Sequence, residues 1–358
     1  MKYSTIWAAG ALALAMTLAG CGQSGSDDQS QASSGSGGDQ SAQPTNLIFG
    51  TGGTSGSYYP IGGALKGVFE KSDQIGNVQV VSTGASVQNI NNIMDGTNQI
   101  AIVMSDVAYD AVHGNKQFEG RKAKIDALAG LYPNVVQIVA LNGSKIDSVA
   151  DLKGKRVGVG KVGSGVEASA KKVLEAAGLK YGDLSKVSHT GYADSVTDMS
   201  NGNLDAAFFT SGVPNSSITG LRQNTQVHFV NVTGETANTL LDKYPYYERY
   251  DIPAHKDNAY DLDSGVHTVS IRNLLIVPAS MDKAVAQDLA QRFYDYLGSD
   301  SVSVAALKQF DRNKMNQNLV LPVHPGAKAF YQTLDQGASQ GQSSDDKADA
   351  EAGDSDAS

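Results

Sequence analysis

The 358-residue sequence has little cysteine and little positive charge, and each shortage excludes a class of protein. A single cysteine cannot form a disulfide within the chain, so no disulfide framework holds the fold together. Lysine and arginine number 28 against 37 aspartate and glutamate residues, and the net charge of −9 argues against nucleic-acid binding. It does not argue against a small anionic ligand, because helix termini can attract an anion locally.

Long apolar runs are also scarce, and the clearest one stands at the start of the chain. The run from Ile6 to Leu18 is typical of a secretory signal and short for a membrane-spanning helix. It ends in Leu-Ala-Gly-Cys, which is similar to the processing box of bacterial lipoproteins. This resemblance implies a signal peptide over residues 1–20 and acylation of Cys21. We therefore expect an extracytoplasmic protein, in the periplasm or at the cell surface, with a lipid anchor; the alternative is a structural cysteine.

Two flanking segments have few apolar residues. Residues 21–45 are rich in Gly, Ser, Gln and Asp, and residues 335–358 are small, polar and acidic. Neither can bury enough surface to offset the entropy of ordering, so we predict a flexible tether and a disordered acidic tail. About 290 residues remain between them, enough for two ordinary domains or one large one.

That central region alternates apolar strands with amphipathic helices, which predicts an α/β fold with a mostly parallel sheet. Two strands are expected at Ile125–Tyr132 and Val135–Leu141, and a long apolar strand at His267–Val277. We expect Val135–Leu141 and His267–Val277 to cross between two lobes. No helix or strand is predicted in the polar and aromatic stretch Tyr246–Asp263.

Small polar turns precede several predicted helices. Residues 50–60 read GTGGTSGSYYP, and residues 82–92 read STGASVQNINN. Glycines allow close approach of a ligand, and hydroxyls beside unpaired helix N–H groups form an anion site. The alternative is a turn with a helix cap. Ser105 and Asp106 repeat the pattern more weakly, with Asp106 better explained as a cap. Either Tyr58 or Tyr59 is expected to face the cleft.

A third such turn, residues 158–165, reads GVGKVGSG. It formally matches a dinucleotide fingerprint, but the next predicted strand ends in His189 and Thr190 instead of the acidic residue that holds a ribose. A phosphate-binding P-loop is out of register as well. What remains is a helix start in which Glu167 either complements the helix dipole as a cap or accepts from a ligand amine.

Motifs for catalysis are missing from the sequence. The six histidines have no metal-ligand spacing, and no nucleophile elbow or paired glycosidase carboxylates occur. We therefore predict a protein that is not an enzyme and that holds neither cofactor nor metal. The rival hypothesis of a different class is a secreted NAD(P)-dependent oxidoreductase that uses GVGKVG.

The strings GTGGTSGSYYP, STGASVQN, ALAGLYPNVVQIVA, LKGKRVGVGKVGSG and DAAFFTSG together resemble the TAXI family, the solute receptors associated with TRAP transporters. The resemblance implies a two-lobed periplasmic-binding-protein fold with two crossover segments. It places lobe 1 at residues 46–137 plus 268–334 and lobe 2 at residues 138–267. It also implies capture of a small organic anion or amino acid, glutamate-like or a dicarboxylate, and delivery to membrane permease subunits driven by an ion gradient. The alternative is the receptor of an ABC-type importer or of a sensor.

No arginine occurs in the small polar turns, so helix N-termini must replace the arginine fork of many receptors. Only Arg272 is considered near the hinge, where burial against the other lobe is an equal alternative. The candidate ligand-binding residues are Thr51, Gly53, Thr54, Ser55, Tyr58, Tyr59, Ser82, Ser86, Gln88, Asn89, Ser105, Tyr132, Ser164, Gly165, Glu167 and Thr210.

Overall fold

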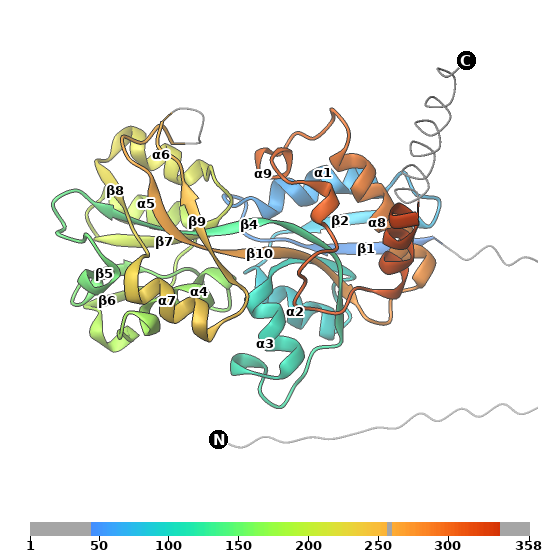
Figure 1. Cartoon of the computed structure of the whole chain (residues 1–358), viewed down its shortest axis with the longest axis horizontal. Coiled ribbons are helices and arrows are strands. Elements are labelled where there is room, and N and C mark those ends of the chain that lie inside the picture. Colours follow the sequence, from blue (N-terminus) through green and yellow to red (C-terminus); the bar gives the residue numbers. More distant parts are fainter. Residues whose placement is uncertain (1–43, 256–259, 337–358) are drawn as a thin grey trace, which may run out of the picture. The chain divides into compact units, whose positions relative to one another are not determined.

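Strands and helices alternate from the first described residues, and in a computed structural model they build an α/β fold (Figure 1). The structure describes residues 44–255 and 260–336. The first lobe contains β1 (Thr45–Gly50), α1 (Tyr58–Phe69), β2 (Ile75–Val81), α2 (Ser86–Met94), β3 (Ile100–Met104), α3 (Ser105–His113) and, from later in the chain, α8 (Lys283–Leu297). Its strands β2, β1 and β3 pair in parallel, as expected where each strand leads into a helix.

The second lobe repeats this arrangement. It contains β5 (Arg156–Gly158), α4 (Gly165–Ala176), β6 (Lys186–Ser188), α5 (Tyr192–Ser200), β7 (Ala206–Ser211), α6 (Ser216–Asn224), β8 (Val227–Val230), α7 (Gly234–Lys243) and β9 (Tyr247–Ile252). Strands β6, β5 and β7 pair in parallel. The remaining short elements are α9 (Ala305–Lys308), the 3-10 turns Lys116–Phe118, Val149–Leu152, Tyr181–Asp183 and Arg312–Lys314, and a helix over residues 325–336.

Two long strands connect the lobes, β4 (Ile125–Leu141) and β10 (Val266–Pro278), and they pair with each other (Figure 1). The strand order is β2-β1-β3-β10-β4-β7-β5-β6, with β8 on β4 and β9 on β10. Strand β10 contacts β3 at its C-terminal end and β9 at its N-terminal end, whereas β4 contacts β7 and β8 beyond residue 135. The predicted α/β fold with two lobes and two crossing segments is confirmed. The residue boundaries of the lobes stay a prediction.

Three predictions about these elements were wrong. The two strands expected at residues 125–141 form one continuous strand. Pro133 has no N–H to donate to the sheet, but it lies opposite Arg272, next to a shift of register in the pairing with β10. The strand therefore continues through the proline. The sheet is mixed and not mostly parallel, since β4 and β10 run antiparallel to every neighbour. Strand β9 and helix α6 were not predicted. The signals available were Tyr247 and Tyr250 of β9 and the Asn215 cap of α6.

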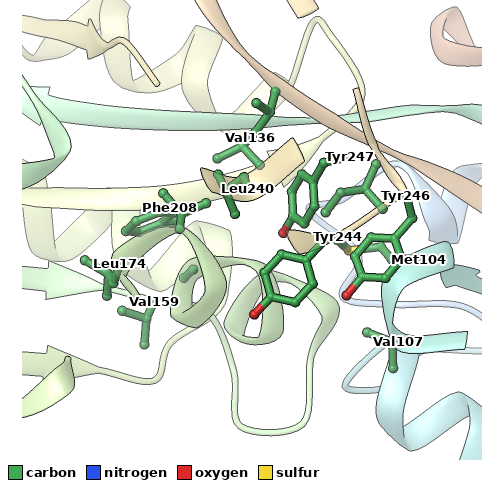
Figure 2. Close-up of a cluster of buried hydrophobic side chains, with 14 of the residues drawn as sticks. Met104, Val107, Val136, Val159, Leu174, Phe208, Leu240, Tyr244, Tyr246 and Tyr247 are labelled. Carbon is green, nitrogen blue, oxygen red and sulfur yellow. The ribbon is translucent and has the colours of Figure 1, made fainter. Parts of the chain in front are cut away.

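Buried side chains on both faces of the sheet form the core. Strand β3 is fully buried, which explains its continuous apolar sequence. One apolar cluster spans both lobes: Met104 and Val107 of the first lobe lie near Val159 and Leu174 of the second, with three tyrosines of residues 244–247 beside them (Figure 2). Packing therefore continues from one lobe to the other on this face of the sheet.

Several predictions lie outside the described residues: the signal peptide, Cys21, and nearly all of the tether and the tail. At their inner edges the structure differs slightly, because Thr45 already belongs to β1 and residues 335 and 336 are still helical. Within residues 44–255 and 260–336, no helix is both long enough and apolar enough to cross a membrane.

Candidate functional site

A cavity of about 250 Å³ lies where the two lobes face each other. Four helices begin at its wall, α1 and α2 from the first lobe and α4 and α5 from the second. The first turn of a helix has N–H groups with no partner inside the helix, and its end carries a partial positive charge. The partial positive charges of these four helix starts therefore lie at one cavity, two from each lobe.

Ten of the sixteen candidate residues line this cavity: Gly53, Thr54, Ser55, Tyr58, Ser82, Ser86, Tyr132, Ser164, Gly165 and Thr210. They come from the predicted turns ahead of α1, α2 and α4, together with one residue each from β4 and β7. Their ligand contacts stay a prediction.

Three other candidates, Thr51, Gln88 and Asn89, do not line the cavity, but each bonds to the backbone of a loop or strand end beside it. The Thr51 hydroxyl donates to the backbone oxygen of Val81 at 2.7 Å. Asn89 is fully buried, and its Nδ2 donates to the backbone oxygen of Thr51 at 2.7 Å. The Gln88 Oε1 accepts from the backbone N–H of Gly84 at 2.5 Å. These bonds give the three side chains a role in positioning the loops, and their ligand contacts stay a prediction.

Tyr59, Ser105 and Glu167 also lie outside the cavity lining. Tyr59 is 37% exposed, whereas Tyr58 is buried and lines the cavity, which answers which of the two faces the cleft. Ser105 is buried at the start of α3. Glu167 accepts from the backbone N–H of Gly163 at 2.7 Å, while the Ser164 hydroxyl accepts from the N–H of Glu167 at 3.1 Å. Glu167 therefore acts as a cap of α4, one of its two predicted roles.

Close contact between the lobes at this site depends on glycine. A Cβ on Gly165 would lie 2.7 Å from the Ser86 hydroxyl and closer still to the sulfur of Met104. Both of those residues belong to the first lobe, so only glycine lets the start of α4 approach it this closely. Across the cavity, the Ser217 hydroxyl donates to the backbone oxygen of Ser55 at 3.4 Å.

Three tyrosines supply the largest side chains of the wall: Tyr58 and Tyr132, which are buried, and Tyr192, which is half-buried. Burial raises the pKa of all three phenols, so they stay neutral and can donate hydrogen bonds near neutral pH. The Tyr58 hydroxyl donates to Oδ1 of the buried Asn273. The Tyr192 hydroxyl donates to the backbone oxygen of Thr210 at 2.7 Å. These rings give the cavity a rigid, partly apolar surface.

Sequence reasoning missed one turn and one polar residue of the wall. The turn leads into α5, and residues 190–194 of this turn and of the first turn of the helix line the cavity. They include Gly191, which lies next to the Lys161 side chain, and Asp194. It follows a strand and carries a Gly before a helix start, the same pattern used for the other turns, so it was detectable. The residue is Asn134 on β4, which no local pattern marks, because its position depends on how the two long strands pair.

Formal charge in the wall is balanced and sparse. Lys161 and Asp194 line the cavity, and both are exposed. Arg272 does not line it: its guanidinium donates to the backbone oxygens of Leu131, Lys314 and Gln317. Arg272 is half-buried, and its partners belong to the first lobe, so the expected burial against the other lobe is not found. Partial burial lowers the pKa of its guanidinium. Asp106 is likewise engaged elsewhere, with Lys172, and is neither the cap of α3 nor part of the wall.

No group of histidine, cysteine, aspartate and glutamate side chains with the geometry of a metal site occurs among the described residues. The GVGKVGSG turn contributes Gly160, Lys161, Ser164 and Gly165 to the same cavity as the turns of the first lobe. This turn therefore belongs to one shared site.

Several solved structures of binding proteins resemble this chain. The alkanesulfonate-binding protein SsuA from Xanthomonas axonopodis pv. citri, bound to MOPS, is 15% identical over 72% of this chain and 74% of its own, with a TM-score of 0.47. A putative L-cystine ABC transporter from Listeria monocytogenes is 13% identical over 71% and 91%, with a TM-score of 0.45. A binding protein component of an ABC phosphonate transporter from Pseudomonas aeruginosa is 12% identical over 74% and 78%, with a TM-score of 0.43.

A protein-family model also matches, over residues 49–333, and its description is NMT1-like family. That range contains both lobes, both crossing strands and every residue of the cavity wall. The narrower identification with the TAXI receptors of TRAP transporters, drawn from the motifs, stays a prediction. The chain belongs to the NMT1-like family.

Proposed function

We propose that this protein is an extracytoplasmic receptor that binds a small organic anion or amino acid between its lobes and delivers it to a membrane permease. The observation that carries the proposal is the cavity, at which helices of both lobes begin with their unpaired N–H groups. Hinge closure about the two crossing strands would bury the ligand. On this account the protein is not an enzyme.

The energetics of the site support a small ligand. A micromolar complex needs about 8 kcal/mol of binding free energy. Each helix N-terminus supplies about 0.3–1 kcal/mol to an anion when exposed and up to about 2 kcal/mol when partly buried. Hydrogen bonds to an ionised ligand add about 1.5–3 kcal/mol each. Four helix starts and a few hydroxyl donors thus reach the required total without an arginine fork.

Delivery to a membrane permease has two candidates. One is an ABC-type importer, the class named for the Listeria and Pseudomonas structures. The other is a TRAP-type transporter driven by an ion gradient, which the motif resemblance implies. Beside the ABC-type importer, the same alternative includes a receptor whose ligand-bound form is recognised by a membrane sensor. Co-purification with permease subunits distinguishes them: an ATPase subunit in the complex supports an importer, and its absence beside a TRAP permease supports the second.

A lipid anchor at Cys21 is part of the same proposal. The Leu-Ala-Gly-Cys string supports cleavage before Cys21, and two or more acyl chains hold a protein stably on a membrane. Cys21→Ser should accumulate as an unprocessed precursor without acyl chains. Normal processing and membrane association of this variant would contradict the anchor and leave the binding site unaffected.

Native mass spectrometry of the freshly purified full chain tests the binding function. We expect a bound small organic anion or amino acid that is released on denaturation and that restores the higher melting temperature when added back. A bound dinucleotide, seen by its absorbance and mass, would instead support the oxidoreductase alternative. A protein that carries no small molecule and is stabilised by none of the candidate anions would contradict the receptor.

A further inference from the structure

A chain of hydrogen bonds behind the cavity wall ends in one oxygen that has no partner. Asn273 is fully buried, and its Nδ2 donates to the backbone oxygen of Tyr132 at 3.0 Å. Its Oδ1 accepts from the Tyr58 hydroxyl. The oxygen of that hydroxyl accepts from Nδ2 of Asn134 at 3.2 Å. The Oδ1 of Asn134 is buried and finds no hydrogen-bond partner among the described residues.

Donor and acceptor roles in this chain are fixed by its first member. A backbone carbonyl only accepts, so the amide NH₂ of Asn273 must face Tyr132 and its Oδ1 must face Tyr58. Tyr58 has one hydroxyl proton and gives it to Asn273, so it must receive a proton from Asn134. The Asn134 amide is thereby held with its NH₂ toward Tyr58. Its carbonyl oxygen remains without a partner among the described residues, and the residue that carries it lines the cavity.

An unpaired acceptor in this position is costly. Asn134 is 3% exposed, and a buried polar atom without a hydrogen bond forfeits the bonds it made to water. Because Asn134 belongs to the cavity wall, a ligand group in the cavity is the partner that can satisfy it. Helix N-termini favour an anionic group of the ligand but do not select its other groups. An unpaired acceptor oxygen selects a second feature, a hydrogen-bond donor on the ligand.

We propose that Asn134 accepts a hydrogen bond from the bound ligand and thereby selects anions that also carry an N–H or O–H donor. The inference rests on the proposed binding function and deepens it. An α-amino acid or α-hydroxy acid meets the requirement, because its ammonium or hydroxyl group can donate to Oδ1 of Asn134. A fully ionised dicarboxylate without a donor leaves that oxygen unpaired, and loses affinity for that reason.

Calorimetric titration of the full chain with three matched pairs tests this inference: L-glutamate against glutarate, L-malate against succinate, and L-phenylalanine against 3-phenylpropanoate. Within any pair that binds, we expect the donor-bearing member to bind about tenfold more tightly or better. Equal affinity of the two members in the wild-type protein would overturn the inference while leaving the receptor function in place. Binding by none of the six compounds would count against both.

Variants at position 134 assign the effect to this residue. Asn134→Leu should bring the affinity ratio of a pair close to one, because no acceptor remains. Asn134→Asp keeps an acceptor oxygen, so the preference for L-glutamate over glutarate should persist although both bind more weakly. An unchanged ratio in Asn134→Leu, with a normal circular dichroism spectrum, would overturn the assignment. The wild-type ratios remain decisive if that variant does not fold.

Discussion

Two of the places where the lobes meet differ in chemistry: the cavity, and a buried ion cluster between α3 and α4. Beside the cavity, the Ser217 hydroxyl of the second lobe donates to the backbone oxygen of Ser55 of the first lobe at 3.4 Å. At the ion cluster, Nζ of Lys172 from the second lobe lies 2.9 Å from Oδ2 of Asp106 and 3.2 Å from Oδ2 of Asp110, both from the first lobe. The bond of Ser217 to Ser55 is long and lies beside the cavity, whereas the ion pairs of Lys172 are short and buried.

The surroundings of Lys172 strengthen that difference. Its Nζ lies 5.0 Å from the ring centroid of Tyr246 and 5.6 Å from that of Tyr244, and Lys172 is buried. Figure 2 shows these two rings beside Tyr247. Burial disfavours the charged ammonium, but Asp106 and Asp110 outweigh it, so the pKa of Lys172 lies above its usual value. The ion cluster is therefore an enclosed, charge-paired contact between α3 of the first lobe and α4 of the second.

Removal of the buried cation should have the largest effect. Lys172→Met leaves Asp106 and Asp110 buried without a counter-charge, which should lower the free energy of unfolding by about 3–5 kcal/mol. Urea unfolding of the full chain measures this change. The matched control is Lys171→Met, at the exposed neighbouring lysine, which should change stability by less than about 0.5 kcal/mol. Equal stability of the two variants would show that the ion cluster does not hold the lobes together.

In the cavity wall, removal of a hydroxyl group should reduce the binding free energy of the ligand more than the free energy of unfolding. Ser164→Ala removes a donor to an ionised ligand and should reduce affinity about tenfold to a hundredfold. Because Ser164 also caps α4, this variant should lose about 1 kcal/mol of stability as well. Thr54→Ala should lose affinity alone, since no side-chain hydrogen bond of Thr54 occurs within the described residues. Unchanged affinity in both variants would place the site elsewhere.

Thr51 provides the opposite case, because it lies next to the cavity but outside its wall. Thr51→Val removes the buried bond to the backbone oxygen of Val81 and should lower the free energy of unfolding by about 1 kcal/mol. Intrinsic affinity should stay close to that of the wild type. Calorimetric titration and thermal melts of the ligand-free protein separate the two effects. A loss of affinity as large as that of Thr54→Ala would mean that Thr51 contacts the ligand after all.

Ligand binding itself should produce the smallest signal. If the lobes close about β4 and β10, a saturating ligand should reduce the radius of gyration measured by small-angle scattering. The melting temperature should rise at the same time, by linkage to binding. A rise in melting temperature without compaction would indicate a ligand that binds to lobes that are already closed.

Local patterns predicted the parts of the site that local structure creates. The turns ahead of α1, α2 and α4 have glycines and hydroxyls followed by helical spacing, and all three line the cavity. The turn ahead of α5 has the same pattern, although it was not among the turns predicted to form the site. The long strand β10 was predicted from its continuous apolar run, nearly to the residue.

The parts that failed depend on contacts between distant segments. Asn134 and Asn273 are polar residues within apolar strands, and their roles follow from the pairing of β4 with β10, which local sequence does not specify. The Lys172 cluster joins helices more than 60 residues apart, and nothing near Lys172 distinguishes it from the exposed Lys171. Among the predicted residues, Asn89 and Gln88 lie outside the cavity lining, and each bonds to the backbone of a neighbouring loop. Asn89 is buried and Gln88 is exposed, a difference that depends on how α2 packs.

The most direct test of the account fills the cavity. A Cβ on Gly53, in the cavity wall, meets nothing within 4 Å, and the same holds for Gly63, which is exposed on α1. Calorimetric titration with the small molecule identified by native mass spectrometry should give no binding for Gly53→Trp. Gly63→Trp should bind like the wild type. Wild-type affinity in a folded Gly53→Trp variant would contradict the claim that this cavity is the binding site.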